Sequence, residues 1–219
     1  MILVTGGAGY IGCVAVRQLL AKGEAVRVFD KLYFGADGLA EVADSVEIVQ
    51  GDIRTFDPAV LDGCDAVLHL AGLSNDPTAE FNPKANEEMN TTGTEIVARA
   101  AKERGIRRFI FASTCSIYDL GFYAEDFLRD EESEVRPRAA YAVSNYNAER
   151  ILLDMRASPY VDNRTIQRRL ASSGARSFSS TRASAPSARE IPASAAATSF
   201  STLFGSNWNS NSFAFRSST

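Results

Sequence analysis

Short apolar runs alternate with longer amphipathic stretches through the first two thirds of the chain. The runs read as strands, and their almost continuous apolar character is typical of parallel strands that are buried on both faces. They cover residues 2–4, 25–30, 46–49, 66–70 and 107–113. Between them, apolar residues recur every three or four positions, which predicts helices from about residue 10 to Gly23, over 85–104 and over 141–155.

Strands that alternate with helices form a parallel sheet whose crossovers cover both faces. We therefore predict a doubly wound α/β fold of the Rossmann type. The pattern ends near residue 156, so the predicted fold is incomplete and is followed by a largely irregular C-terminal segment.

The composition changes at the same place. Residues 1–156 hold 16 basic and 25 acidic residues, a net charge of −9, whereas residues 157–219 hold 7 arginines and 2 acids, a net charge of +5. The second part also contains 16 serines and 11 alanines, with apolar residues scattered among them. Because it lacks the apolar density that offsets the entropy of ordering, we expect most of 163–219 to have no stable fold.

Three hypotheses account for this second part, 157–219. The favoured one is a shifted reading frame or misplaced gene end near residues 156–165, which reading the other two frames of the DNA would test. A natural disordered tail is the second. The third is an Arg/Ser arm that binds nucleic acid, but seven dispersed arginines without lysine blocks or stacking motifs give it little support.

The composition of the whole chain narrows the classes of function. A net charge of −4 gives no bulk reason to expect nucleic-acid or membrane binding, and no apolar run reaches the length of a membrane span. Three widely spaced cysteines without a CxxC pair indicate neither a disulfide framework nor a structural zinc site. Since the start shows no signal peptide, we expect a cytoplasmic protein.

The segment that carries chemistry is a glycine-rich turn between the first strand and the first helix. It runs through residues 6–12, G-G-A-G-Y-I-G, in which Gly6, Gly9 and Gly12 carry the motif together with Tyr10 and Ile11. Glycines allow a tight turn and a close approach of the backbone to a pyrophosphate, which the N–H groups and positive dipole end of the helix then bind. In this context the motif predicts a dinucleotide site.

A carboxylate at the end of the second strand refines this prediction. Asp30 follows Gly12 by 18 positions, where it can accept hydrogen bonds from both hydroxyls of a ribose. A carboxylate there repels a 2′-phosphate, so NAD is favoured over NADP. The adjacent Lys31 weakens that preference without reversing it.

Six elements in the right order over residues 1–156 resemble the extended short-chain dehydrogenase/reductase family, which contains the NAD-dependent nucleotide-sugar epimerases and dehydratases. They are T-G-G-A-G-Y-I-G at 5–12, G-D-I at 51–53, H-L-A-G at 69–72, N-T-T-G-T at 90–94, S-T-C-S-I-Y at 113–118 and P-R-A-A-Y-A-V-S at 137–144. The resemblance implies NAD as cofactor and a nucleotide sugar as substrate. It also implies cofactor contacts at Asp52, Ile53, Leu70, Ala71, Gly72 and Asn90, with Asn90 bracing the site.

The resemblance further implies the chemistry. Tyr141 acts as base on a sugar hydroxyl while hydride leaves the same carbon for NAD, and Thr114 orients that oxygen. Cys115 and Ser116 stand where the dehydratase branch has an Asp-Glu pair, which favours epimerisation over water elimination. A homodimer through the helices at 85–104 and 141–155 is a further implication.

One departure from the family pattern concerns the base. The family has a lysine four residues after the tyrosine, and its ammonium favours the phenolate and binds the nicotinamide ribose. This chain has Asn145, which brings no positive charge. We therefore expect weakened NAD binding and severely reduced turnover; the alternative is that Asn145 is merely a solvated helix residue. A non-catalytic NAD-binding module and the damaged product of a broken gene remain competing interpretations.

Overall fold

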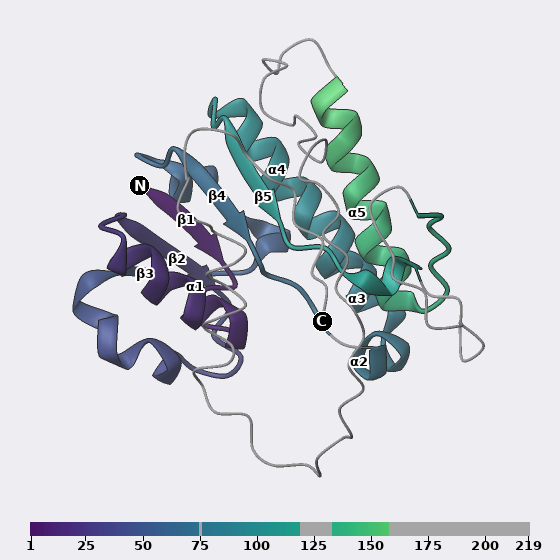
Figure 1. Ribbon diagram of the computed structural model, residues 1–219, viewed down its shortest axis with the longest axis horizontal. Helices are drawn as coiled ribbons and strands as arrows, with labels where there is room; N and C mark the ends of the chain where they lie inside the picture. Colours follow the sequence, from purple (N-terminus) through teal and green to yellow (C-terminus); the bar gives the residue numbers. More distant parts are fainter. Residues whose placement is uncertain (75, 119–132, 158–219) are drawn as a thin grey trace, which may run out of the picture.

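The computed structural model describes residues 1–74, 76–118 and 133–157. Five parallel strands form one sheet in the order β3-β2-β1-β4-β5 (Figure 1). Their bounds are β1 Ile2–Thr5, β2 Val26–Asp30, β3 Glu47–Gln50, β4 Ala66–His69 and β5 Arg108–Phe111. This confirms the predicted doubly wound α/β fold. The segment 163–219, which we expected to lack a stable fold, lies outside the described residues.

Helices follow the strands. The α-helices are α1 Tyr10–Ala21, α2 Asp76–Phe81, α3 Pro83–Glu87, α4 Thr94–Glu103 and α5 Ala140–Ala157. Short 3₁₀ segments are η1 Asp37–Ser45, η2 Ile53–Thr55, η3 Pro58–Leu61 and η5 Cys115–Tyr118. The continuous helix predicted over 85–104 is wrong in one respect, because a π-helical turn, η4 Glu88–Gly93, separates α3 from α4.

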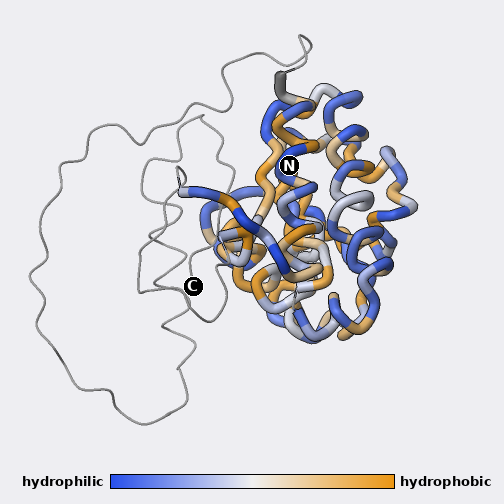
Figure 2. Tube along the Cα trace, turned by 90° about the vertical axis from the view of Figure 1, so that its right-hand side faces the viewer, coloured by the Kyte–Doolittle hydropathy of each residue, from blue (hydrophilic) through white to orange (hydrophobic). Residues whose placement is uncertain are grey.

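The sheet separates two hydrophobic clusters. On one face, Val16 and Leu19 of α1 pack with Val4 of β1. On the other face, Leu3 and Val97 belong to a cluster formed largely by α4 and the strands. Figure 1 shows α1 on one side of the sheet and α4 with α5 on the other, and hydrophobic and hydrophilic segments alternate along the helices in Figure 2. The alternation of apolar positions therefore builds a core on each side.

The strand order places the switch point of the fold between β1 and β4. The chain leaves β1 toward α1 on one face, and it leaves β4 toward α4 on the opposite face. Open α/β sheets bind ligands in the crevice beyond the carboxyl ends of such strands. Thr5 and His69 end these two strands and are paired in register, so the loops after them face the same crevice.

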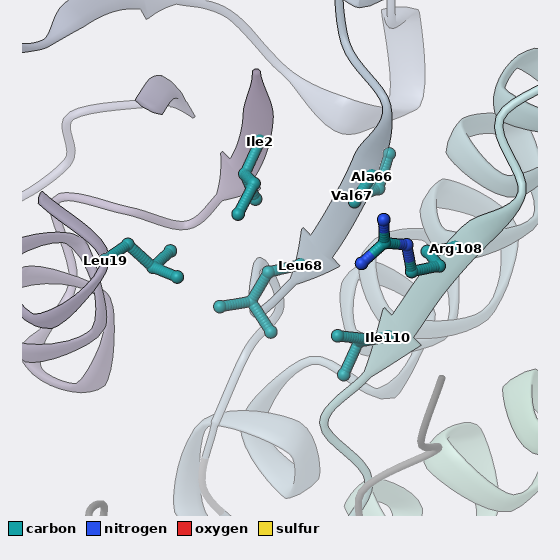
Figure 3. Close-up of a pocket in the computed structure, with 7 residues that line it drawn as sticks. All are labelled: Ile2, Leu19, Ala66, Val67, Leu68, Arg108 and Ile110. Carbon is teal, nitrogen blue, oxygen red and sulfur yellow. The ribbon is translucent and has the colours of Figure 1, made fainter. Parts of the chain in front are cut away.

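A small apolar pocket lies elsewhere, between α1 and the strands β1, β4 and β5 (Figure 3). Leu19 borders it from α1, and Leu68 and Ile110 border it from the sheet. Arg108 supplies the polar group of this lining. Because the pocket lies on the flank of the sheet and not beyond the carboxyl ends of the strands, we do not assign it to the site below. Among the described residues, no helix is long and apolar enough to cross a membrane.

Candidate functional site

The glycine-rich turn leaves no room for side chains. Gly6 has φ +71°, and a Cβ on it would lie 2.7 Å from the backbone nitrogen of Ala71. A Cβ on Gly12 would overlap the Gly6 carbonyl oxygen and the backbone of Gly7. At Gly6, the loops after β1 and β4 are in backbone contact. At Gly12, the first turn of α1 packs directly on the glycine-rich turn. Only glycine therefore fits at positions 6 and 12, because any side chain there would clash with backbone atoms.

The N-terminus of α1 opens onto this turn. Its N-cap residue is Gly9, no side chain caps it, and its first turn holds no acidic residue. Tyr10 and Ile11, the first two residues of the helix, are exposed, at 87% and 50% respectively. Uncapped N–H groups together with exposed apolar side chains form a surface that suits an anion carrying a flat, apolar group. The arrangement fits the phosphates of a dinucleotide.

Asp30 lies at the carboxyl end of β2 and connects two loops. Its Oδ2 accepts a hydrogen bond from Ala8 N at 3.0 Å, and its Oδ1 accepts one from Leu32 N at 2.8 Å. Leu32 adopts φ 58°, an uncommon conformation for a residue with a side chain. The carboxylate thus fixes the glycine-rich turn before any ligand arrives, and each oxygen keeps a lone pair for a ribose hydroxyl.

Asp52 follows β3 at the same edge of the sheet. It accepts hydrogen bonds from Lys31 Nζ at 2.5 Å and from Arg54 Nη2 at 2.6 Å. Arg54, and after it Lys31, hold the pKa of this carboxyl well below its usual range. Ile53, the next residue, is buried against the π-helical turn, where a Cβ on Gly93 would meet its side chain. Asp52 is therefore already engaged where the resemblance implies an adenine contact.

The loop after β4 carries Leu70, Ala71 and Gly72 and is held by Asn90 of the π-helical turn. Asn90 Oδ1 accepts a hydrogen bond from Leu73 N at 2.7 Å, and Asn90 Nδ2 donates to Leu73 O at 3.0 Å. A Cβ on Gly72 would lie 2.7 Å from Asn90 Oδ1. This double hydrogen bond to one residue braces the loop after β4 against the π-helical turn.

The brace extends to α5 through buried polar side chains that the sequence reasoning missed. Asn90 Nδ2 also donates to Asn86 Oδ1 at 2.9 Å, and Asn86 Nδ2 donates to Ser144 Oγ at 2.9 Å. Ser144 Oγ in turn donates to Tyr141 O at 2.9 Å. The sequence signal for this network is the spacing of four residues between Asn86 and Asn90, which places both side chains on one face of a helix. This network fixes α5 against the loop after β4.

Tyr141 projects from the first turn of α5. With Asn145, Gly72 and Asn90 it lines a polar pocket at the carboxyl ends of β4 and β5. Burial raises the pKa of the Tyr141 phenol, and the side-chain hydrogen bond with Thr114 acts in the opposite direction. The structure therefore brings Tyr141 and Thr114 together beside the loop that contacts the glycine-rich turn.

The position of Asn145 contradicts one of the two interpretations of this residue. The side chain is buried, at 5% exposure, so the interpretation of Asn145 as a solvated helix residue is wrong. Its Nδ2 donates to Tyr141 O at 2.9 Å, one turn earlier on α5. The amide is thus turned toward the helix backbone and places no positive charge near the phenol.

His69 is a core residue. It is fully buried, and burial lowers its pKa from 6.5 to about 3. Thr94 Oγ1 donates to Asn90 O at 2.7 Å, so it accepts from His69 Nε2 at 3.0 Å. His69 Nδ1 then accepts from Thr5 Oγ1 at 2.7 Å. Both ring nitrogens of the neutral imidazole are satisfied, which leaves no role as a base.

Comparison with known proteins matches residues 2–185 to the NAD dependent epimerase/dehydratase family. The dTDP-glucose 4,6-dehydratase of Streptomyces niveus is 36% identical over 155 residues, which cover 65% of this chain and 45% of that protein. The UDP-glucose 4-epimerase of Rhizobium meliloti (strain 1021) is 34% identical over 159 residues, covering 70% of this chain and 46% of that protein.

Solved structures give the same result. The dTDP-glucose 4,6-dehydratase DesIV from Streptomyces venezuelae, solved with NAD and TYD bound, superimposes with a TM-score of 0.66 and 30% identity. The match covers 74% of this chain and 53% of that one. The chain thus spans about half the length of the relatives that it matches. Its glycine-rich turn, its braced loop after β4 and its matched residues 2–185 make the chain a member of the NAD dependent epimerase/dehydratase family.

Proposed function

We propose that this chain binds NAD and carries the cofactor half of a nucleotide-sugar epimerase or dehydratase site. Gly6, Gly9 and Gly12 with the start of α1 would hold the pyrophosphate, and Asp30 would hold the adenosine ribose. Leu70, Ala71 and Gly72 would line the nicotinamide side. An added Cβ at Gly6 or Gly12 would clash with backbone atoms, so both positions need glycine. This tight glycine turn before α1 supports the proposed pyrophosphate site.

The proposed chemistry is removal of hydrogen from a sugar carbinol carbon. Tyr141 accepts the proton of the sugar hydroxyl, and Thr114 orients that oxygen by a hydrogen bond. NAD, when bound, accepts the hydride from the same carbon. The observation that carries the proposal is the hydrogen bond between Thr114 and Tyr141, together with the place of Tyr141 in the polar pocket that Gly72 also lines.

We further propose that turnover is low because of Asn145. A tyrosine with an ordinary pKa near 10 is phenolate in only about one molecule in a thousand at pH 7. Burial raises the pKa of Tyr141 further, and the neutral Asn145 amide does not offset it. The base is therefore protonated almost all of the time.

The variant Asn145→Lys tests this. It should raise the rate of NAD-dependent epimerisation or oxidation of a nucleotide sugar by orders of magnitude, because an ammonium one turn from Tyr141 favours the phenolate. Asn147→Lys is a matched control, since it places the same charge on α5 two residues away. An unchanged rate in Asn145→Lys, with NAD still bound, would show that the missing charge is not what limits turnover.

A non-catalytic NAD-binding module is the second candidate, and the replacement at Asn145 favours it. Thermal unfolding with and without NAD separates the candidates. Stabilisation by NAD without turnover of UDP-glucose or dTDP-glucose supports the module, whereas measurable turnover supports the enzyme. A chain that NAD does not stabilise would contradict both.

The proposal extends to partners and compartment. Nucleotide sugars are the proposed substrates because the matched dehydratase and epimerase are named for them. A homodimer is proposed through α4 and α5, which are joined by a hydrogen bond from Lys102 Nζ to Met155 O at 2.9 Å. Cys13, Cys64 and Cys115 are thiols that form no disulfide with one another, and we propose the cytoplasm, a reducing compartment, as the location.

A further inference from the structure

Charged side chains from three segments meet beside the proposed ribose site. Asp52 lies at their centre, with Lys31 from the loop after β2, Arg54 from η2, and Glu88 from the start of η4. We call these four residues the Asp52 cluster. Arg54 bridges the two carboxylates, since its Nη1 lies 3.4 Å from Glu88 Oε2.

Asp52 is saturated by its neighbours in the cluster. Its Oδ1 accepts from Arg54 N at 2.9 Å and from Arg54 Nε at 3.0 Å. Its Oδ2 accepts from Lys31 Nζ at 2.5 Å and from Arg54 Nη2 at 2.6 Å. The side chain of Asp52 is 16% exposed, and those of Lys31 and Arg54 are 32% exposed. The two cations are therefore partly accessible but already paired with one carboxylate.

The cluster adjoins the carboxylate that selects the ribose. Lys31 follows Asp30 directly, and Gly51 N donates to Asp30 O at 2.9 Å, one residue before Asp52. A 2′-phosphate on the ribose at Asp30 would thus lie close to Lys31 and Arg54. Unpaired lysine and arginine side chains bind phosphate oxygens strongly, and in this type of fold a nearby arginine accommodates the 2′-phosphate of NADP.

We propose that Asp52 is a specificity-determining residue for the cofactor: by pairing with Lys31 and Arg54, it withholds both cations from a 2′-phosphate and, with Asp30, excludes NADP. The inference rests on the proposed function, because it presumes a dinucleotide at this edge of the sheet. It changes the interpretation of Lys31, whose charge weakens the NAD preference only when it is not paired.

The net charge around the ribose site predicts that Asp52→Asn raises the affinity for NADP. Asp30 and the four residues of the Asp52 cluster carry three negative and two positive charges, a net charge of −1. Asp52→Asn would bring this to zero and leave Lys31 without a carboxylate partner in the cluster, so the charge beside the ribose becomes more positive by one unit. Asparagine has the same shape and keeps an acceptor for Arg54 N, so η2 retains its N-cap. At surface dielectric constants, one charge within several ångströms changes affinity by about three- to tenfold.

The experiment is calorimetric titration of the full chain with NAD and with NADP. Asp52→Asn should raise NADP affinity relative to NAD affinity by about three- to tenfold. Adding Lys31→Gln to it should reverse most of this gain. Glu47→Gln is the matched control, because Glu47 pairs with Arg27 at 2.7 Å across the same two strands but at their amino ends. Its ratio should equal that of the wild type.

The outcomes separate the inference from the proposed function. A wild type that binds neither dinucleotide would overturn the proposed function. A wild type that binds NAD, with an unchanged affinity ratio in Asp52→Asn, would overturn the inference alone. The affinity ratio of the single variant Lys31→Gln tests the inference even if the Asp52 variant does not fold. Because Lys31 is paired, its loss should leave the ratio within about twofold of the wild type; a large loss of NADP affinity would overturn the inference.

Discussion

The buried histidine predicts how the stability of the domain depends on pH. His69 has a pKa of about 3 in the folded chain and 6.5 when unperturbed. The folded state thus disfavours the proton. Its contribution to stability is complete above pH 6.5 and is lost progressively as the pH falls toward 3. Protonation would also place a donor on Nδ1 against the Thr5 hydroxyl.

The magnitude follows from the difference between the two pKa values. Each pH unit between them corresponds to about 1.4 kcal/mol, so lowering the pH from 7.5 to 5 should reduce the free energy of unfolding by about 2 kcal/mol. The effect can be isolated because His69 is the single histidine of the chain. Asp52, whose pKa is lowered, loses its contribution only at more acidic pH.

The assay is urea unfolding followed by circular dichroism at several pH values between 7.5 and 5. Glu149 has a raised pKa and acts with the opposite sign in this range, so the comparison is made in a Glu149→Gln background. Adding His69→Gln should flatten the curve. As a second readout, the single histidine proton resonance should not titrate above pH 5. A wild-type resonance that titrates near pH 6.5 would refute the reasoning.

Three further predictions concern the turn, the brace and α5. Gly12→Ala should abolish NAD-induced thermal stabilisation, because its Cβ would overlap the Gly6 carbonyl, whereas Gly9→Ala, with its nearest contact at 3.2 Å, should reduce it only slightly; equal effects would contradict the packing argument. Asn90→Ala should lower the free energy of unfolding by about 2–4 kcal/mol in urea, since it leaves several buried partners unpaired, and a loss under 1 kcal/mol would contradict the brace. Burial raises the pKa of Glu149, so its contribution to stability is complete below its unfolded pKa of 4.5 and is lost as the pH rises. Glu149→Gln should therefore raise the melting temperature more at pH 8 than at pH 5, and an equal change at both would count against this account.

The strands and the glycine-rich turn could be predicted because their signals are local. Val4, for example, ends the apolar run of residues 2–4, and Val28 lies in a mostly apolar run that Arg27 interrupts. Such runs are typical of central parallel strands. The requirement for glycine at Gly6 and Gly12 follows from a spacing that a single segment contains. The sequence therefore suffices to predict the fold and the proposed cofactor turn.

The features that could not be predicted depend on contacts between distant segments. The pairing of Lys31 with Asp52 joins the ends of two different strands, and neither segment signals the other. Asn145 lies in a helix with a weak apolar pattern, Y-A-V-S-N-Y-N-A-E-R, so its burial was not evident. Asn145 is buried because hydrogen bonds of Asn86 and Asn90 with Ser144 hold α5 against η4. This polar contact leaves no strong hydrophobic pattern in the sequence of α5.

The π-helical turn Glu88–Gly93 has a consequence for length variation in this part of the chain. A π turn holds one residue more than the α-helical turn it replaces, and one residue rotates everything beyond it by about 100° around the helix axis. With the extra residue, Asn86 faces Ser144 of α5 while Val97 enters the core beneath the sheet. Deleting the exposed Thr92 would restore a regular helix but break this phase relation. A single-residue deletion here should therefore do more damage than a substitution at the same position.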